Sequence, residues 1–112
     1  MLIYKIFRAP EWATLQSDGE TAGAPIDVTD GFVHFSTAAQ TAETLEKHFA
    51  GEDGLILLAV ETDDLGDALE WEESRGGQLF PHLYRKLRMS DVAWHTPIAL
   101  EGGKHILPGD MK

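Results

Sequence analysis

The chain has 112 residues, the length of one domain, and we expect a single domain over residues 1–112. It contains no Cys, which excludes disulfide bonds, a thiol nucleophile and a thiolate metal site. The net charge of -10 disfavours bulk nucleic acid as a partner, because a polyanion would be repelled.

The N-terminal segment predicts a strand followed by a short helix. Residues 2–8 alternate and are rich in β-formers. Because two basic residues interrupt this apolar segment, we expect no signal segment or membrane span, and we predict a cytoplasmic protein without a membrane partner. Pro10 starts a helix over residues 10–15, in which the spacing of Trp12 and Leu15 directs both toward the core.

A loop and a second strand come next. Residues 17–29 contain two Gly, one Pro and few large apolar side chains, which predicts a loop long enough to be a lid or a binding loop. Residues 31–36 predict a strand. Since strand residues alternate faces, one face carries Phe32, His34 and Ser36 and the other carries Val33 and Phe35, which fit a core.

The middle of the chain predicts a helix and a central strand. Thr37 and Gln40 form a capping box, and Gly51 ends the helix. One face of this helix is apolar and consists of Ala38, Ala42, Leu45 and Phe49. Residues 55–60 are apolar without alternation, which indicates a strand that is buried on both faces.

The last part of the chain predicts short strands. Residues 68–73 read as a strand with Trp71 inward and Glu70 and Glu72 on the opposite face. Residues 80–84 are expected to be irregular or a single turn. The final elements are a strand at 92–100, a hairpin turn at 101–104 and a return strand at 105–107.

This order of elements predicts an α+β fold. We expect a mixed, mostly antiparallel sheet of about five to six strands with two helices on one face or flank. The other face is then partly open or covered by loops 17–29 and 74–90, which leaves a cleft for His34 and Ser36.

Charge is unevenly distributed in the second half of the chain. Residues 61–73 hold seven acids and no base, whereas residues 75–88 hold four bases and no acid. One interpretation is a solvated acidic turn beside a balancing loop. The other is a local anion-binding patch suited to a small phosphate-bearing ligand.

The pair His34 and Ser36 is the first candidate site. Positions i and i+2 on a strand point in parallel, so a nucleophile–base pair is not expected. Ser36 or Thr37 is also the natural N-cap of the following helix. His34 is therefore either a site residue or a hydrogen-bonded structural histidine.

The segment Phe80-Pro81-His82-Leu83-Tyr84-Arg85 is the second candidate. It presents His82, Tyr84 and Arg85 within four residues, and these side chains suit a ribose, a phosphate and a stacked ring. The alternative is a loop that Phe80 and Tyr84 anchor to the core. Glu72 is a candidate general base or ribose ligand, or else an ordinary exposed strand residue. No His pair has helical metal-ligand spacing, so no metal site is expected.

These motifs resemble a small bacterial family known as domain-of-unknown-function family 952. The shared residues extend from about residue 2 to about residue 92. They are Tyr4-Lys5-Ile6, Glu11-Trp12, Asp30 to Thr37 with Gln40, Leu57-Leu58, Trp71-Glu72 and Phe80 to Tyr84, and they include the motifs DGF(I/V)H-x-S and FPH-x-Y. The family name itself carries no activity.

A more distant resemblance is to the ADP-ribosyltransferase-like superfamily and its RNA 2′-phosphotransferase branch. It implies a cleft for NAD or an ADP-ribosylated intermediate, with roles at Lys5, at His34 and Ser36, and at Glu72 or Tyr84. Lys5 stands where related sequences often have His. A Lys binds phosphate but cannot make the directed hydrogen bonds of an imidazole, which counts against transferase activity.

Three functions therefore stay open: an enzyme acting on NAD, ADP-ribose or a nucleotide-type substrate, a noncatalytic module for a small phosphate-bearing ligand, and a structural or interaction domain. NAD is the cofactor that the resemblance suggests, and the oligomeric state is left open. The catalytic candidates are His34, Ser36, Glu72 and Tyr84. The ligand-binding candidates are Lys5, Trp12, Thr37, His82 and Arg85.

Overall fold

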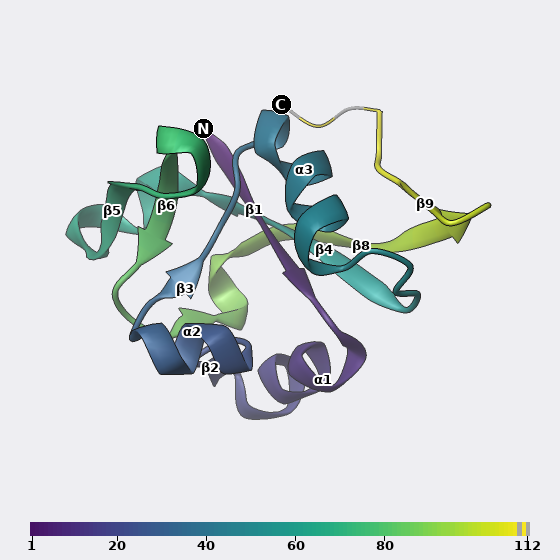
Figure 1. Ribbon diagram of the computed structural model, residues 1–112. Coiled ribbons are helices and arrows are strands. Elements are labelled where there is room, and N and C mark those ends of the chain that lie inside the picture. Colours follow the sequence, from purple (N-terminus) through teal and green to yellow (C-terminus); the bar gives the residue numbers. More distant parts are fainter. Residues whose placement is uncertain (110, 112) are drawn as a thin grey trace.

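The largest sheet has four antiparallel strands in the order β1-β4-β8-β9 (Figure 1). In the computed structural model, which describes residues 1–109 and 111, these strands are Leu2–Phe7, Leu55–Glu61, Val92–Glu101 and Lys104–Ile106. The central position of β4 confirms the prediction from its unbroken apolar sequence. The β8–β9 hairpin confirms the predicted C-terminal turn and return strand.

Two smaller sheets complete the strand arrangement. One has the order β3-β6-β5 and the other pairs β2 with β7. Their strands are β2 (Glu20–Thr21), β3 (Val33–His34), β5 (Leu69–Glu73), β6 (Leu79–Leu83) and β7 (Leu87–Arg88). Tyr4 and Ser36 exchange two backbone hydrogen bonds of 2.8 and 2.9 Å, which joins β1 to the residues just after β3.

Three α-helices lie around these sheets within the described residues. They are α1 (Ala9–Asp18), α2 (Pro25–Asp30) and α3 (Ala38–His48). The capping box that opens α3 is present, because Thr37 accepts from the Gln40 backbone N–H and the Gln40 side chain accepts from that of Thr37. Short 3-10 turns occur at Thr62–Asp64, Gly66–Ala68, Arg75–Gly77 and Met89–Asp91.

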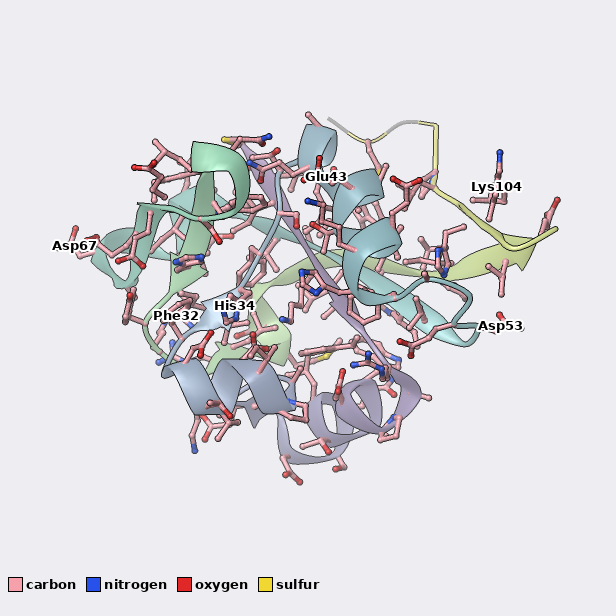
Figure 2. The ribbon with its side chains drawn as sticks, in the orientation of Figure 1. Phe32, His34, Glu43, Asp53, Asp67 and Lys104 are labelled. Carbon is pink, nitrogen blue, oxygen red and sulfur yellow. The ribbon has the colours of Figure 1, made fainter. Side chains whose placement is uncertain are left out.

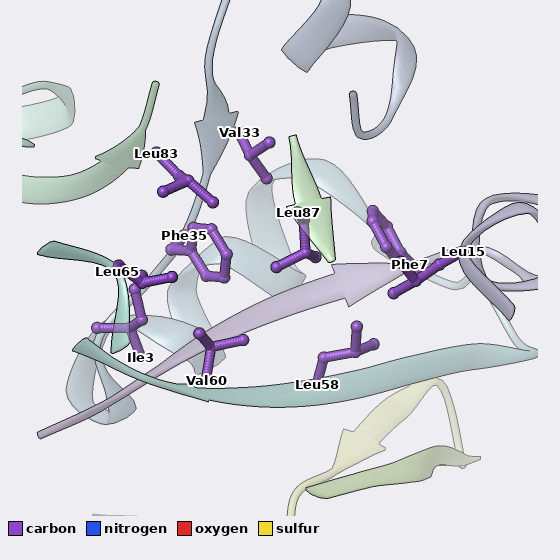
Figure 3. Packing of buried hydrophobic residues seen from close by; sticks show 10 residues of the cluster. All are labelled: Ile3, Phe7, Leu15, Val33, Phe35, Leu58, Val60, Leu65, Leu83 and Leu87. Carbon is purple, nitrogen blue, oxygen red and sulfur yellow. The ribbon is translucent and has the colours of Figure 1, made fainter. Parts of the chain in front are cut away.

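Alternate residues of β1 and β4 enter two apolar clusters. Figure 3 shows the first cluster, in which Ile3, Phe7, Leu58 and Val60 pack with Leu15 of α1. The second cluster contains Tyr4, Ile6, Leu57 and Ala59 together with Leu45 of α3. Helices therefore cover both faces of the main sheet, and the expectation of helices on one face or flank is wrong.

The α+β class is confirmed, but several predicted elements are wrong. Within the described residues there are nine strands and three α-helices, more than expected. The predicted loop 17–29 contains β2 and α2, because Pro25 opens a helix too short to show apolar periodicity. Residues 80–84 fall mostly in strand β6, and Trp71 is 40% exposed rather than inward.

Pro81 explains why β6 was difficult to predict. Pro cannot donate to a strand ladder and usually argues against a central strand. Here its carbonyl accepts the Phe35 backbone N–H at 3.0 Å, so the residue still contributes to pairing. Among the helices within the described residues, none has both the length and the apolar character needed to cross a membrane.

Candidate functional site

A cavity of about 570 Å³ lies between the N-terminal strand, α2, β3 and the end of α3. Its basic lining residues are Lys5, Arg8, His34, His48 and His82. Its apolar walls come from Tyr4, Ile6, Pro25, Ile26, Phe35, Phe49 and Phe80. The structure agrees with the alternation predicted after Gly31, since Val33 and Phe35 belong to the core cluster and His34 and Ser36 do not, although Phe35 also borders the cavity beside His34 and Ser36.

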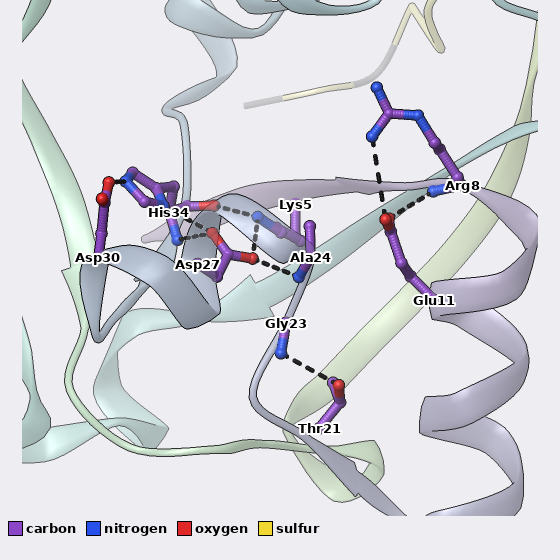
Figure 4. A network of polar contacts seen from close by, with 9 residues as sticks. All are labelled: Lys5, Arg8, Glu11, Thr21, Gly23, Ala24, Asp27, Asp30 and His34. Carbon is purple, nitrogen blue, oxygen red and sulfur yellow. Dashed lines mark hydrogen bonds and ion pairs between the residues drawn. The ribbon is translucent and has the colours of Figure 1, made fainter.

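A chain of charged side chains forms one wall of the cavity (Figure 4). Lys5 Nζ lies 2.7 Å from Asp27 Oδ2 and donates to the His34 carbonyl at 3.0 Å. The Asp27 Oδ1 atom is 2.6 Å from His34 Nδ1, and Asp30 Oδ2 is 3.0 Å from His34 Nε2. This chain joins β1, α2 and β3 through side chains and the backbone of His34.

The pair Lys5 and Asp27 is buried, with 6% and 1% of each residue exposed. Burial lowers the pKa of Lys5 below its ordinary value, and the Asp27 carboxylate opposes that shift. Burial alone would raise the pKa of Asp27, but the hydrogen bond from His34 and the charge of Lys5 outweigh it and hold this pKa below its ordinary value. Asp27 is therefore a carboxylate at neutral pH, and its charge neutralises the buried ammonium group.

Helix α2 places Asp27 where Lys5 and His34 can reach it. The Asp27 side chain accepts the Ala24 backbone N–H at 2.7 Å, so it also caps the start of its own helix. Gly31 ends the helix with a φ of 85°, a left-handed conformation that favours glycine. The chain then turns directly into β3, which carries His34.

A second polar group surrounds His82 on β6. His82 Nδ1 lies 2.8 Å from Glu72 Oε1, and Tyr84 donates to the same oxygen at 2.6 Å. The hydrogen bonds from Tyr84 and His82 lower the pKa of Glu72, and the hydrogen bond to Glu72 raises the pKa of Tyr84 to about 12. Glu72 is not among the cavity-lining residues, so it stands behind His82 rather than inside the cavity.

Phe32 connects the two histidine groups. Its ring stacks on His82 with centroids 4.2 Å apart, and its centroid lies 4.5 Å from that of His34 and 5.1 Å from that of Tyr84. The two imidazole centroids are 5.3 Å apart. Figure 2 shows Phe32 and His34 side by side above α2. The sequence motifs around His34 and His82 therefore do converge in space.

Arg8 directly follows β1 and also lines the cavity. Its Nε and Nη2 atoms donate to the Glu52 carboxylate at 2.8 and 2.9 Å, and its guanidinium group lies over the Phe49 ring at 4.7 Å. Glu52 does not line the cavity. Ser36 Oγ shares a hydrogen bond of 2.9 Å with Thr44 Oγ1, and both residues line the cavity.

Five predicted site residues do not line the cavity, namely Glu72, Tyr84, Trp12, Thr37 and Arg85. Trp12 packs against His95 and the first apolar cluster, and Thr37 caps α3. Arg85 makes a bidentate ion pair with Asp91, at 2.8 and 3.0 Å. Since Lys86 also pairs with Glu20, two of the four bases in residues 75–88 are engaged by carboxylates away from the cavity.

Sequence reasoning missed Arg8, Asp27, Asp30 and His48. Asp27 was hidden in a predicted loop, and its neighbour Pro25 was the available sign of a helix start. Arg8 and His48 end a predicted strand and a predicted helix, and nothing in their spacing indicates that the two ends meet. In the described part of the chain, no group of three or more His, Asp or Glu side chains is arranged to hold a metal ion.

Comparisons with known proteins agree with the resemblance in the motifs. The family model described as "Protein of unknown function (DUF952)" matches residues 6–95. The crystal structure of protein CC0527 from Caulobacter crescentus is 44% identical, with a TM-score of 0.91 over 95% of this chain and 94% of that one. The solution structure of CC0527 gives 44% identity and a TM-score of 0.82 over 93% and 90%. No curated protein matches this chain significantly.

Proposed function

We propose that this chain, which belongs to the DUF952 family, binds a small phosphate-bearing ligand of the nucleotide class in the cavity beside Lys5 and His34. The observation that carries the proposal is the sign of the groups that face the cavity. Among the described residues, the cations Lys5 and Arg8 and three histidines line it, whereas Asp30 is the single carboxylate that does. Such a lining favours an anion.

The partner carboxylates support this arrangement because they lie behind the basic groups. Asp27, Glu52 and Glu72 contact Lys5, Arg8 and His82, but none of the three lines the cavity. They hold the basic groups in place while standing outside the cavity lining. Glu52 accepts from Nε and Nη2 of Arg8, and Glu11 lies 3.9 Å from Nη1, so the guanidinium group keeps N–H donors beyond its two hydrogen bonds to Glu52.

The size and walls of the cavity suit a ligand with an apolar or aromatic body. Its volume of about 570 Å³ falls within the range of roughly 300–1,000 Å³ that is usual for ligand pockets. Phe49, Phe80, Ser36 and Thr44 line the cavity, so its wall has the aromatic and hydroxyl character that suits a nucleoside. The resemblance to the ADP-ribosyltransferase-like superfamily supports NAD and ADP-ribose as the first ligands to test.

Isothermal calorimetry with NAD, ADP-ribose, AMP and adenosine tests the proposal. The phosphate-bearing ligands should bind, and adenosine should bind more weakly because it lacks the anion. Arg8→Gln should weaken AMP binding by about tenfold or more, the value of one charge-assisted hydrogen bond. Lys104→Gln is the matched control, since Lys104 is an exposed cation of β9 on the far side of the molecule from His34 (Figure 2). Absence of binding at millimolar ligand, or equal affinity for AMP and adenosine, contradicts the proposal.

A further inference from the structure

We infer that His82 is a general base in this cavity and that Glu72 is its positioning residue, for the attack of water on the phosphorus of a bound nucleotide ester. The inference rests on the proposed function, because it needs the ligand phosphate to enter the same cavity. It adds catalysis to the proposed ligand binding, and it assigns proton transfer to His82 and not to His34.

The hydrogen bonds of His82 leave one nitrogen available. Glu72 Oε1 lies 2.8 Å from Nδ1, so in the neutral ring Nδ1 carries the proton and Nε2 carries the lone pair. Among the side chains of residues 1–74, 76–109 and 111, no hydrogen bond to Nε2 is found, and none of the buried polar side-chain atoms described there lacks a partner. Nε2 is therefore not sealed in the core, and His82 is a cavity-lining residue.

His34 has the opposite environment. Its Nδ1 and Nε2 atoms lie 2.6 and 3.0 Å from Asp27 and Asp30, so both ring nitrogens are engaged by carboxylates. Two imidazoles with centroids 5.3 Å apart thus have different surroundings. Such a difference separates the roles of paired titratable groups. His34 suits charge stabilisation, and His82 suits proton transfer.

Tyr84 and Phe32 fix the base in place. The pKa of Tyr84 is raised to about 12, so its hydroxyl stays a donor to Glu72, and the lowered pKa of Glu72 keeps that group a carboxylate. Phe32 stacks on the imidazole ring with an interplanar angle of 26°. A carboxylate that holds Nδ1 while the opposite nitrogen faces substrate is the arrangement by which enzymes orient a histidine base.

The reaction step is hydrolysis of a phosphoester bond. Nε2 of His82 takes one proton from water, and a lone pair of the water oxygen forms a new bond to phosphorus. The bond from phosphorus to the leaving oxygen breaks, and its electron pair departs with that oxygen as an alkoxide or phenoxide. Release of the proton from His82 to solvent restores the base, so one water is consumed and no oxidant or reductant is needed.

The p-nitrophenyl ester of thymidine 5′-monophosphate is a suitable probe, because p-nitrophenolate leaves without a proton donor. Release of p-nitrophenolate should be measurable with the unaltered protein. His82→Ala should lower kcat by about 10²–10⁴-fold, the contribution of general base catalysis. Added imidazole should restore part of that loss, which a purely structural role would not allow. His82→Asn keeps a donor toward Glu72 and should melt near the unaltered protein, but without turnover.

Glu72→Gln should lower kcat with little change in KM, since Glu72 does not line the cavity. His95→Asn is the control that should keep full activity, because His95 packs on Trp12 and does not line the cavity. Calorimetry with thymidine 5′-monophosphate separates the two proposals. Binding without turnover, or turnover that survives His82→Ala, overturns the inference and leaves the proposed function intact. Absence of binding overturns the proposed function and the inference with it.

Discussion

Asp27 is the residue on which the polar wall of the cavity depends most. Its Oδ1 atom accepts from the backbone and the ring of His34, and its Oδ2 atom accepts from Ala24 N and Lys5 Nζ. These contacts join β1, α2 and β3. A buried carboxylate with four donors is fully satisfied, whereas a buried ammonium group without its carboxylate is not.

Replacing Asp27 should therefore cost more stability than replacing Lys5. We expect Asp27→Asn to lower the free energy of unfolding by about 3–5 kcal/mol, because it leaves Lys5 as an unpaired buried charge. Lys5→Met should cost less, since Asp27 keeps its three contacts with Ala24 and His34. Urea denaturation of the three proteins at neutral pH measures the difference. An equal loss of unfolding free energy in both variants contradicts the expectation that Asp27 contributes more stability than Lys5.

The same pair gives a pH dependence with a defined sign. The pKa of Asp27 is lowered in the folded protein, so the stability that its charge contributes is present above the ordinary Asp pKa. That stability is lost as the pH falls through the lowered value. The gap in unfolding free energy between the unaltered protein and Asp27→Asn should thus narrow in acid. A gap that stays constant from neutral pH into that range would show that the charge of Asp27 is not involved.

The sequence was enough to predict some residues of the polar cavity wall, and there is a physical reason why the others could not be predicted. Strand alternation was enough to place His34 and Ser36 on one face and Val33 and Phe35 in the core. Alternation acts over neighbouring residues. The contact between Lys5 and Asp27 joins residues that are distant along the chain, and no local pattern specifies such a pair.

At the scale of elements, α2 is the segment that shapes the cavity. It has six residues and supplies Pro25, Ile26 and Asp30 to the lining. So short a helix is marginal by itself, and its capping and tertiary contacts must hold it in place. One of those tertiary contacts is the close approach of Gly23 to the Asp27 carboxyl group, with which a Cβ atom built at Gly23 would clash.

Gly23→Ala should be clearly destabilising. Its φ is +103°, and the added Cβ atom would stand within van der Waals overlap of Asp27, the residue that caps α2 and pairs with Lys5. The matched control is Gly19→Ala, where φ is +78° and the added atom would meet nothing within 4 Å. Gly19→Ala should cost about 1–2 kcal/mol from the left-handed backbone alone, and Gly23→Ala more. Thermal and urea unfolding compare the two, and equal losses would mean that Asp27 can move aside.

Elements with a clear hydrophobic pattern or a helix-capping motif could be predicted from the sequence. Elements without either signal could not. The capping box located the start of α3, and the unbroken apolar run identified β4 as the central strand. In contrast, β6 contains Pro81, and its neighbour β3 has two residues. A strand of that length carries too few residues to show a period, so its pairing depends on tertiary contacts.

At the scale of the whole molecule, we expect the net charge of -10 and the basic lining of the cavity to favour a small anion over a polymer of many phosphates. A small anion that binds beside Lys5, Arg8 and the histidines brings only a few negative charges near the negatively charged protein. A polymer would keep many phosphates against that surface. Repulsion between like charges rises with every phosphate near the protein, so we expect a polyanion to bind more weakly than a small anion.

This selection predicts a difference in thermal stabilisation between a nucleotide and a nucleic acid. A ligand that binds only the folded state at about 100 times its Kd adds about 2.7 kcal/mol to the free energy of unfolding, which raises the Tm of a domain of this size by on the order of 10 °C. We expect AMP or ADP-ribose at that ratio to produce such a shift in scanning fluorimetry. Short duplex DNA at the same phosphate concentration should produce none, because its phosphates cannot leave the duplex to enter the cavity. Equal shifts from duplex and nucleotide would locate phosphate binding on the outer surface, where Arg8→Gln should then have no effect on either shift.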